Sequence, residues 1–150
     1  MAVDGSENSD RALDFALDIS EKFNAAIMIL NVSESLPMVP VQDGFTPIPE
    51  EPTAYPGGDA ALISEDLQKA HEEVLSRAVA HAKKVKPNLN ISSTLIEGEP
   101  AHEIVSAAKK GGFDVIVVGH RGMGKMEELF LGSVSMKVAH LTPCPVLIVK

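Results

Sequence analysis

The sequence predicts a single α/β domain that spans residues 1–150. Two nearly continuous apolar runs, residues 25–32 and 114–118, have the pattern of parallel strands covered on both faces. Segments with apolar residues at helical spacing lie between the strands, and this alternation favours a doubly wound parallel sheet with helices on both faces. A chain of 150 residues is long enough to bury one continuous core.

The elements are expected in regular order. Ala2–Ser6 reads as the end of a strand that enters a turn, and Ser6 or Ser9 can cap the next helix. That helix carries one buried stripe, formed by Leu13, Leu17 or Ala16, Ser20 and Phe23. Further strands are expected at residues 25–32, 91–97, 114–118 and 146–149, and further helices before Pro87, from Pro100 and from about Ser133 to His140.

Two segments depart from this regular pattern. Residues 33–58 hold six of the ten prolines and are predicted to form a long loop inside the domain, because too little chain precedes them to form a core. Only Met1–Val3 precede Asp4, whereas a central strand usually needs about five residues. The chain is therefore either trimmed at its start or has a short first strand.

Composition and charge exclude several classes of function. The net charge of -8 argues against nucleic-acid binding and gives no reason to expect adhesion to anionic membranes. No apolar run is long enough to span a bilayer and the start has no leader pattern, so we expect a soluble cytoplasmic protein. The single cysteine, Cys144, permits no intrachain disulfide. Residues 1–68 carry a net charge of -11 and residues 69–150 a net +3, which favours the second half for an anion site.

The segment from Gly119 to Ser135 is the most informative part of the sequence. It leaves a buried strand and ends in a helix, and its glycines let backbone amides face a ligand without a Cβ in the way. The helix N-terminus adds unpaired N–H groups and positive potential, so the segment predicts a phosphate cradle. Ser133 and Ser135 are either phosphate donors or helix caps, and Gly132 can also be a simple tight turn.

Two well-known phosphate-binding motifs do not fit this segment. A Walker A loop fits Gly119 to Lys125, but Met126 stands where the metal-binding hydroxyl is needed. The dinucleotide fingerprint fails as well, because the glycines have the reverse spacing and do not follow the first strand. The five histidines are scattered without a close pair, so we expect surface or satisfied side chains and no metal chelation by histidine.

The spacing that fits is Gly119, two residues, Gly122, nine residues and Gly132-Ser133. It resembles the nucleotide-binding signature of the universal stress protein family, in its ATP-binding branch. Ala2–Ser6 resembles the family's first strand and turn, and Thr142–Val149 its final strand. The resemblance implies a Rossmann-like, five-stranded parallel sheet in the order 3-2-1-4-5, which brings Asp4 beside Gly119 at the point where such sheets bind ligands.

The resemblance also implies roles for particular residues. Asp4 would reach the ribose or a phosphate-bound metal, Mg²⁺ or Mn²⁺, and Val3 and Val32 would help to line the adenine pocket. Backbone at Gly119 and Gly122 would approach the sugar and phosphates. The outer phosphates of ATP would lie against the start of the last helix, at Gly132, Ser133, Val134 and Ser135. Arg121 is either a phosphate contact or a surface arginine.

Three functions follow as hypotheses. The first is an ATP-binding switch or sensor in a stress response, in which nucleotide occupancy alters partner binding. The second is a slow metal-dependent ATP hydrolase, for which the motif supplies no evident base beyond His120 or Asp4. The third is a structural interaction domain without nucleotide. We also expect a homodimer through the edge strand Val146–Val149, in line with the family.

Overall fold

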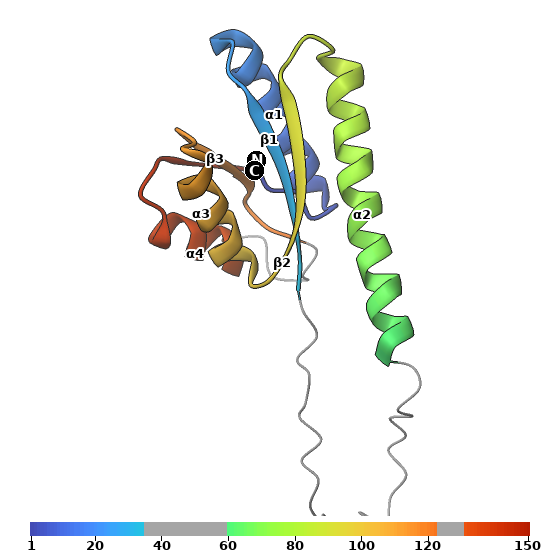
Figure 1. Cartoon of the computed structure of the whole chain (residues 1–150). Coiled ribbons are helices and arrows are strands. Elements are labelled where there is room, and N and C mark those ends of the chain that lie inside the picture. Colours follow the sequence, from blue (N-terminus) through green and yellow to red (C-terminus); the bar gives the residue numbers. More distant parts are fainter. Residues whose placement is uncertain (35–59, 123–130) are drawn as a thin grey trace, which may run out of the picture.

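A computed structural model describes residues 1–34, 60–122 and 131–150. Most of the predicted loop at 33–58 and the middle of the glycine segment lie outside these residues. The described elements alternate between helix and strand, as the sequence predicts (Figure 1). In chain order they are α1 Glu7–Phe23, β1 Ile27–Ser33, α2 Ala60–Val85, β2 Ile91–Glu97, α3 Pro100–Gly111, β3 Ile116–Gly119, α4 Ser133–Leu141 and β4 Val146–Val149.

The strands form two parallel pairs. β1 pairs with β2 from Ile27 beside Ile91, and β3 pairs with β4 from Ile116 beside Val146. The first residues of the chain run between the pairs: the Val3 N–H donates to the Leu30 carbonyl at 2.8 Å, and the Ala2 N–H donates to the Val117 carbonyl at 3.1 Å. The expected first strand is thus present as an isolated bridge at Ala2, with hydrogen bonds toward both pairs.

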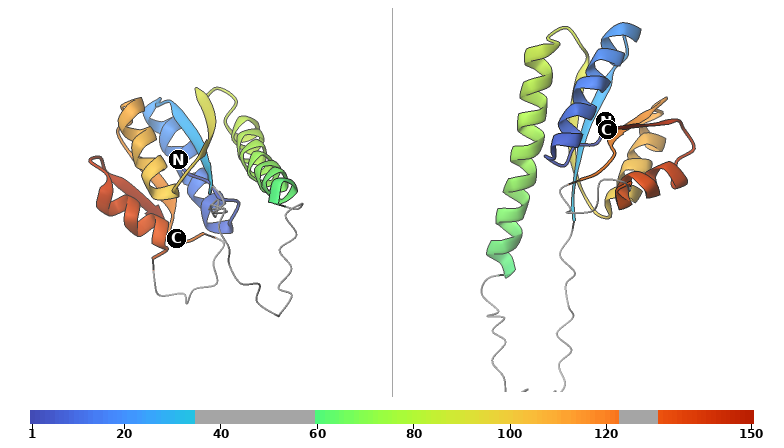
Figure 2. Two further views of the ribbon diagram at one scale, coloured as in Figure 1. Left: turned by 60° about the horizontal axis from the view of Figure 1, so that its bottom comes forward. Right: turned by 180° about the vertical axis from the view of Figure 1, so that it is seen from behind.

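Helices cover both faces of these strands (Figures 1 and 2). One core cluster lies under α1 and α2 and includes Leu17, Ile29 and Ala82. The other lies under α3 and α4 and includes Leu30 and Val138. Adjacent strand residues enter opposite clusters because side chains alternate across a strand, and this explains why the predicted strands are apolar almost throughout.

The ends of the elements follow local chemistry. Ser6 caps α1 by accepting the Ser9 N–H at 3.2 Å, and Gly112 ends α3 in the left-handed conformation at φ 62°. The prediction that Phe23 belongs to the buried stripe of α1 is wrong, since its exposed fraction is 72%. The next residue, Asn24, turns left-handed at φ 50° and ends the helix, so Phe23 lies beyond the core.

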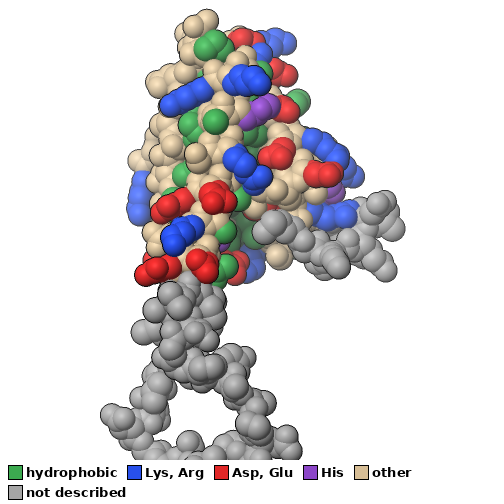
Figure 3. All heavy atoms as spheres, turned by 90° about the vertical axis from the view of Figure 1, so that its right-hand side faces the viewer, with side chains coloured by type: hydrophobic (Ala, Val, Ile, Leu, Met, Phe, Trp, Pro, Cys, Tyr) green, Lys and Arg blue, Asp and Glu red, His purple; other side chains and the backbone are tan. Residues whose placement is uncertain are grey.

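Helix α2 lies along the outside of β1 and β2. Figure 3 views this side of the molecule and shows acidic and basic side chains interspersed over it. The inner face of α2 carries the buried Ala78 and Ala82, whereas Leu67 and Val85 are 41% and 48% exposed. The apolar stripe predicted for this helix is therefore fully buried only at Ala78 and Ala82 among the described side chains, and its last residue, Val85, is exposed.

Candidate functional site

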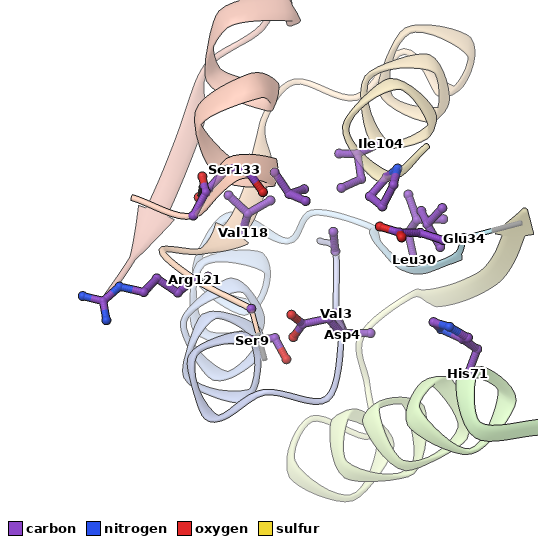
Figure 4. A pocket seen from close by; sticks show the side chains of 18 of the residues that line it. Val3, Asp4, Ser9, Leu30, Glu34, His71, Ile104, Val118, Arg121 and Ser133 are labelled. Atoms are coloured by element: carbon purple, nitrogen blue, oxygen red, sulfur yellow. Dashed lines mark hydrogen bonds between the residues drawn. The ribbon is translucent and has the colours of Figure 1, made fainter. Parts of the chain in front are cut away.

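A cavity of about 540 Å³ lies beyond the carboxyl ends of β1 and β3, beside the first turn of α4. Its size falls in the range of small-molecule sites. The residues predicted from the sequence all line it: Val3, Asp4, Val32, Gly119, Arg121, Gly122, Gly132, Ser133, Val134 and Ser135. Figure 4 shows side chains from both halves of the chain around this space. The fold thus gathers segments that are more than 100 residues apart into one wall.

Backbone hydrogen bonds join the two parts of the glycine motif. The carbonyl of His120, at the end of β3, accepts the Gly132 N–H at 2.7 Å and the Ser135 hydroxyl at 3.0 Å. The N–H of His120 donates to the Val149 carbonyl at 2.7 Å, which anchors this residue to β4. Hydrogen bonds therefore join the end of β3 and the start of α4 in one corner, which we call the cradle end of the cavity.

Ser135 is a structural part of this corner. Its side chain is only 3% exposed, and its hydroxyl lies 3.0 Å from the carbonyls of both His120 and Gly132. Because a hydroxyl has a single proton, that proton is already donated inside the protein. Ser133 differs, since it is exposed at the mouth of the cavity and its hydroxyl makes no hydrogen bond with the described residues.

The glycines of the motif are explained by close packing, since Gly119, Gly122 and Gly132 all have ordinary negative φ. A Cβ on Gly119 would lie 2.9 Å from backbone atoms of Asn8 in α1. A Cβ on Gly132 would lie 3.2 Å from the His120 carbonyl oxygen, and one on Gly122 would overlap a carboxylate oxygen of Asp4. The sequence analysis explained these glycines only by the approach of a ligand to the backbone. The structure adds a second reason, because a side chain at each position would collide with other atoms of the protein.

Asp4 lies in the middle of the cavity wall, between the cradle end and β1 (Figure 4). Its Oδ1 accepts the Ser6 N–H at 3.0 Å, in a turn that Gly5 allows by its φ of 84°. Its Oδ2 faces Gly122. The Ser6 hydroxyl also donates to the Arg121 carbonyl at 3.4 Å, so the turn and the glycine motif hold each other in place.

The start of α4 supplies positive potential to the cradle end. Its N-cap, Gly132, contributes no side-chain hydrogen bond, so the first N–H groups of the helix are left for another acceptor. Arg121 is the only lysine or arginine among the described residues that line the cavity. This end therefore presents backbone donors and one hydroxyl, a combination suited to a phosphate chain, whereas the Arg121 guanidinium points away from the cavity in Figure 4.

The opposite end of the cavity is built by residues that the sequence analysis missed. Glu34 follows β1, and Leu67 and His71 project from α2; we call this the α2 end. Behind it, the buried Asn31 side chain donates to the Val3 carbonyl at 2.7 Å and lies 2.7 Å from Nδ1 of His71. One signal was visible: Asn31 is the only polar residue in the apolar run 25–32.

His120 contributes backbone to the site, but its side chain is not part of the cavity wall. Its Nδ1 is buried and has no hydrogen-bond partner among the described residues. Burial lowers the pKa of this imidazole, and the charges of Arg121 and Lys150 lower it further. This geometry places His120 poorly as a base for a ligand in the cavity.

A metal ion carried by the phosphates of a ligand would find one carboxylate near the cradle end among the described residues, that of Asp4. No group of three histidine, cysteine or acidic side chains suitable for a metal occurs within residues 1–34, 60–122 and 131–150. Asp4 accepts the Ser6 N–H on Oδ1, and its Oδ2 makes no hydrogen bond with the described residues. This donor set fits Mg²⁺ held mainly by phosphates and water, with one protein carboxylate.

The fold and the cavity define an α/β protein with a ligand site at the carboxyl ends of parallel strands. Comparison with known proteins then identifies the family. The model of the universal stress protein family matches residues 1–150. Universal stress protein YxiE of Bacillus subtilis (strain 168) is 35% identical over 151 residues, which cover 100% of this chain and 96% of the relative. The chain belongs to the universal stress protein family.

Solved structures support the same fold. Universal stress protein UspA from Lactobacillus plantarum matches with a TM-score of 0.76 at 20% identity, over 99% of this chain and 94% of that one. A universal stress protein solved in complex with cAMP matches with a TM-score of 0.69 at 26% identity, over 100% of this chain and 94% of that one. No described helix of this chain has the length and apolarity needed to cross a membrane.

Proposed function

We propose that this chain binds an adenine nucleotide, ATP with Mg²⁺ or Mn²⁺, and acts as a nucleotide-dependent switch or sensor in a stress response. The observation that carries the proposal is the gathering of all ten predicted site residues around one cavity of about 540 Å³. The relative that binds cAMP adds support, because cAMP is an adenine nucleotide.

The two ends of the cavity suggest how the nucleotide lies. The phosphates would meet the start of α4, where Ser133 and unpaired N–H groups face the cavity and Arg121 lies nearby. The ribose would lie at Asp4, whose Oδ2 can accept a hydroxyl or bind the metal. The base would extend between Val3 and Val32 toward the α2 end.

The proposal includes a single sheet of five strands in the order 3-2-1-4-5. In this order Met1–Val3 is strand 1, β1 and β2 are strands 2 and 3, and β3 and β4 are strands 4 and 5. The hydrogen bonds of Val3 to Leu30 and of Ala2 to Val117 support this order, because they join the short first segment to both strand pairs.

We also propose a cytoplasmic location, in keeping with a single cysteine, and cell fractionation tests it.

A slow ATP hydrolase is the second candidate. Among the residues that the structure describes, Asp4 is the one acidic side chain beside the proposed phosphate path, and the His120 side chain is not part of the cavity wall. Any hydrolysis would therefore depend on the bound metal and on Asp4, and we expect it to be slow. A third candidate, an interaction domain without nucleotide, predicts that the cavity binds no nucleotide at all.

One series of measurements on the purified full chain separates these candidates. The protein is denatured and the released nucleotide is identified by mass spectrometry; ATP with Mg²⁺ is then titrated by calorimetry, and phosphate release is assayed. Binding without turnover above background supports the switch. Clear turnover that Asp4→Ala abolishes supports the hydrolase. Absence of bound or bindable nucleotide overturns the proposal and favours the interaction domain.

We propose a homodimer through β4. Its pairing with β3 uses one edge, and no described strand pairs with the other. The strand Val146–Val149 is wholly apolar, and an unpaired apolar edge invites pairing with a second copy. Light scattering at micromolar concentration should give the mass of two chains, and a monomer would reject this part of the proposal.

A further inference from the structure

The pair formed by Asn31 and His71 fixes the state of one imidazole. A carbonyl can only accept, so the contact with Val3 O requires that the amide nitrogen of Asn31 faces Val3. Its amide oxygen then faces Nδ1 of His71 at 2.7 Å, and this nitrogen must carry a proton to donate. In the neutral imidazole Nε2 is therefore the bare nitrogen, and it can only accept a hydrogen bond.

The His71 side chain lies at the end of the cavity away from the cradle. In Figure 4, Arg121 and Ser133 lie on one side, Asp4 in the middle, and His71 and Glu34 on the other side. Nε2 of His71 makes no hydrogen bond with the described residues, and the Glu34 side chain is exposed. Both groups are acceptors, and the one described cation of the cavity wall, Arg121, is at the far end.

We propose that His71 reads the purine base: its Nε2 accepts a hydrogen bond from the 6-amino group of adenine, and Asn31 is the positioning residue that holds the required tautomer. The inference rests on the proposed nucleotide binding and goes beyond it by assigning base selectivity to a side chain of α2. A 6-oxo purine presents a carbonyl oxygen at the same position, so two acceptors would face each other. Sites built around a hydrogen bond reject such analogues strongly.

The first test compares ligands with the unaltered full chain. ATP, inosine triphosphate and purine riboside triphosphate are titrated with Mg²⁺ by calorimetry at pH 8. We expect inosine triphosphate to bind about tenfold or more weakly than ATP, with purine riboside triphosphate between them because it lacks only the amino group. Equal affinity for ATP and inosine triphosphate would overturn the inference.

The second test removes the acceptor and keeps the ring. In His71→Phe the ratio of ATP to inosine triphosphate affinity should fall to less than about threefold. The matched control is His81→Phe on the same helix, since His81 contacts Asp14 outside the cavity and should leave the wild-type ratio unchanged. An unchanged ratio in His71→Phe would contradict the assignment while ATP binding itself, and so the proposed function, still stood.

A spectroscopic measurement keeps the inference testable if His71→Phe does not fold. Long-range ¹H–¹⁵N spectra of the wild-type protein with ¹⁵N-labelled histidine report which ring nitrogen carries the proton. We expect a protonated Nδ1 and a bare Nε2 for His71, with the Nε2 resonance shifting when ATP binds and not when inosine triphosphate binds. A protonated Nδ1 with an Nε2 that is indifferent to ATP would overturn the base-reading role, and absence of any ATP binding would instead overturn the proposed function.

Discussion

The two ends of the cavity are built in different ways. The cradle end consists mainly of backbone from the described residues after β3 and at the start of α4, and its geometry depends on the absence of a side chain at Gly119, Gly122 and Gly132. The α2 end consists of side chains from α2 and from Glu34, the residue after β1, and the buried Asn31 of β1 holds His71 in place. The phosphate chain is the same whichever base a nucleotide carries, whereas one base must be distinguished from another. We therefore expect the backbone of the cradle end to bind the phosphates and the side chains of the α2 end to select the base.

The largest expected effect is a loss of stability at the cradle end. In Gly119→Ala the new Cβ would meet backbone atoms of Asn8 and Ser9 at 2.9–3.0 Å, and a helix backbone cannot move aside as a side chain can. We expect the free energy of unfolding in urea to fall by about 1–3 kcal/mol. In Gly132→Ala the new Cβ would lie 3.2–3.3 Å from its nearest neighbours, so the free energy of unfolding should fall by less. Wild-type stability in Gly119→Ala would refute the packing role of this glycine.

The next effect concerns the middle of the cavity. Asp4→Asn keeps an oxygen that can accept the Ser6 N–H but removes the charge that would meet the ribose or metal. Affinity for ATP with Mg²⁺ should fall about tenfold or more, with little change in melting temperature. Asp114→Asn, an exposed carboxylate outside this cavity, is the control. If both variants bind ATP equally well, Asp4 has no part in binding.

Two serines only two residues apart sharpen the assignment of the phosphate path. Ser133→Ala should lower the affinity for ATP about three- to tenfold and leave the affinity for AMP nearly unchanged, because the exposed hydroxyl would meet the outer phosphates. Ser135→Ala should lower the affinity for ATP and AMP by the same factor, since its hydroxyl makes hydrogen bonds that hold the corner at His120 together. Calorimetric titration with the two nucleotides distinguishes these patterns. Equal losses for ATP and AMP in Ser133→Ala would mean that the phosphates lie elsewhere.

The smallest expected effect is a dependence of stability on pH at the same corner. Burial lowers the pKa of His120 in the folded state, so the unfolded chain binds this proton first as the pH falls. Stability should therefore decrease below about pH 6.5, the ordinary histidine pKa, and level off below the lowered folded value. His120→Phe should lose less stability than the wild type between pH 7.5 and pH 5.5 in urea unfolding. An identical loss in both proteins would show that other groups cause the decrease.

The sequence predicts the two ends of the cavity unequally, for a physical reason. Glycine spacing and a helix start lie within one continuous segment, so Gly119 to Ser135 indicate the cradle end directly. The exposure of Phe23 was not predicted, because helical spacing does not show which end of a helix extends beyond the core into solvent. His71 joins the cavity through a tertiary contact with Asn31, 40 residues away, which no local pattern encodes. The internal role of Ser135 also depends on a carbonyl 15 residues away.

A crystal structure of the full chain with a non-hydrolysable ATP analogue and Mg²⁺ tests the central claim most directly. We expect one nucleotide across the cavity, with its outer phosphates within hydrogen-bond distance of Ser133 and the first N–H groups of α4. The adenine amino group should lie within hydrogen-bond distance of Nε2 of His71. A nucleotide bound outside this cavity, or bound with its base at the cradle end, would contradict the account.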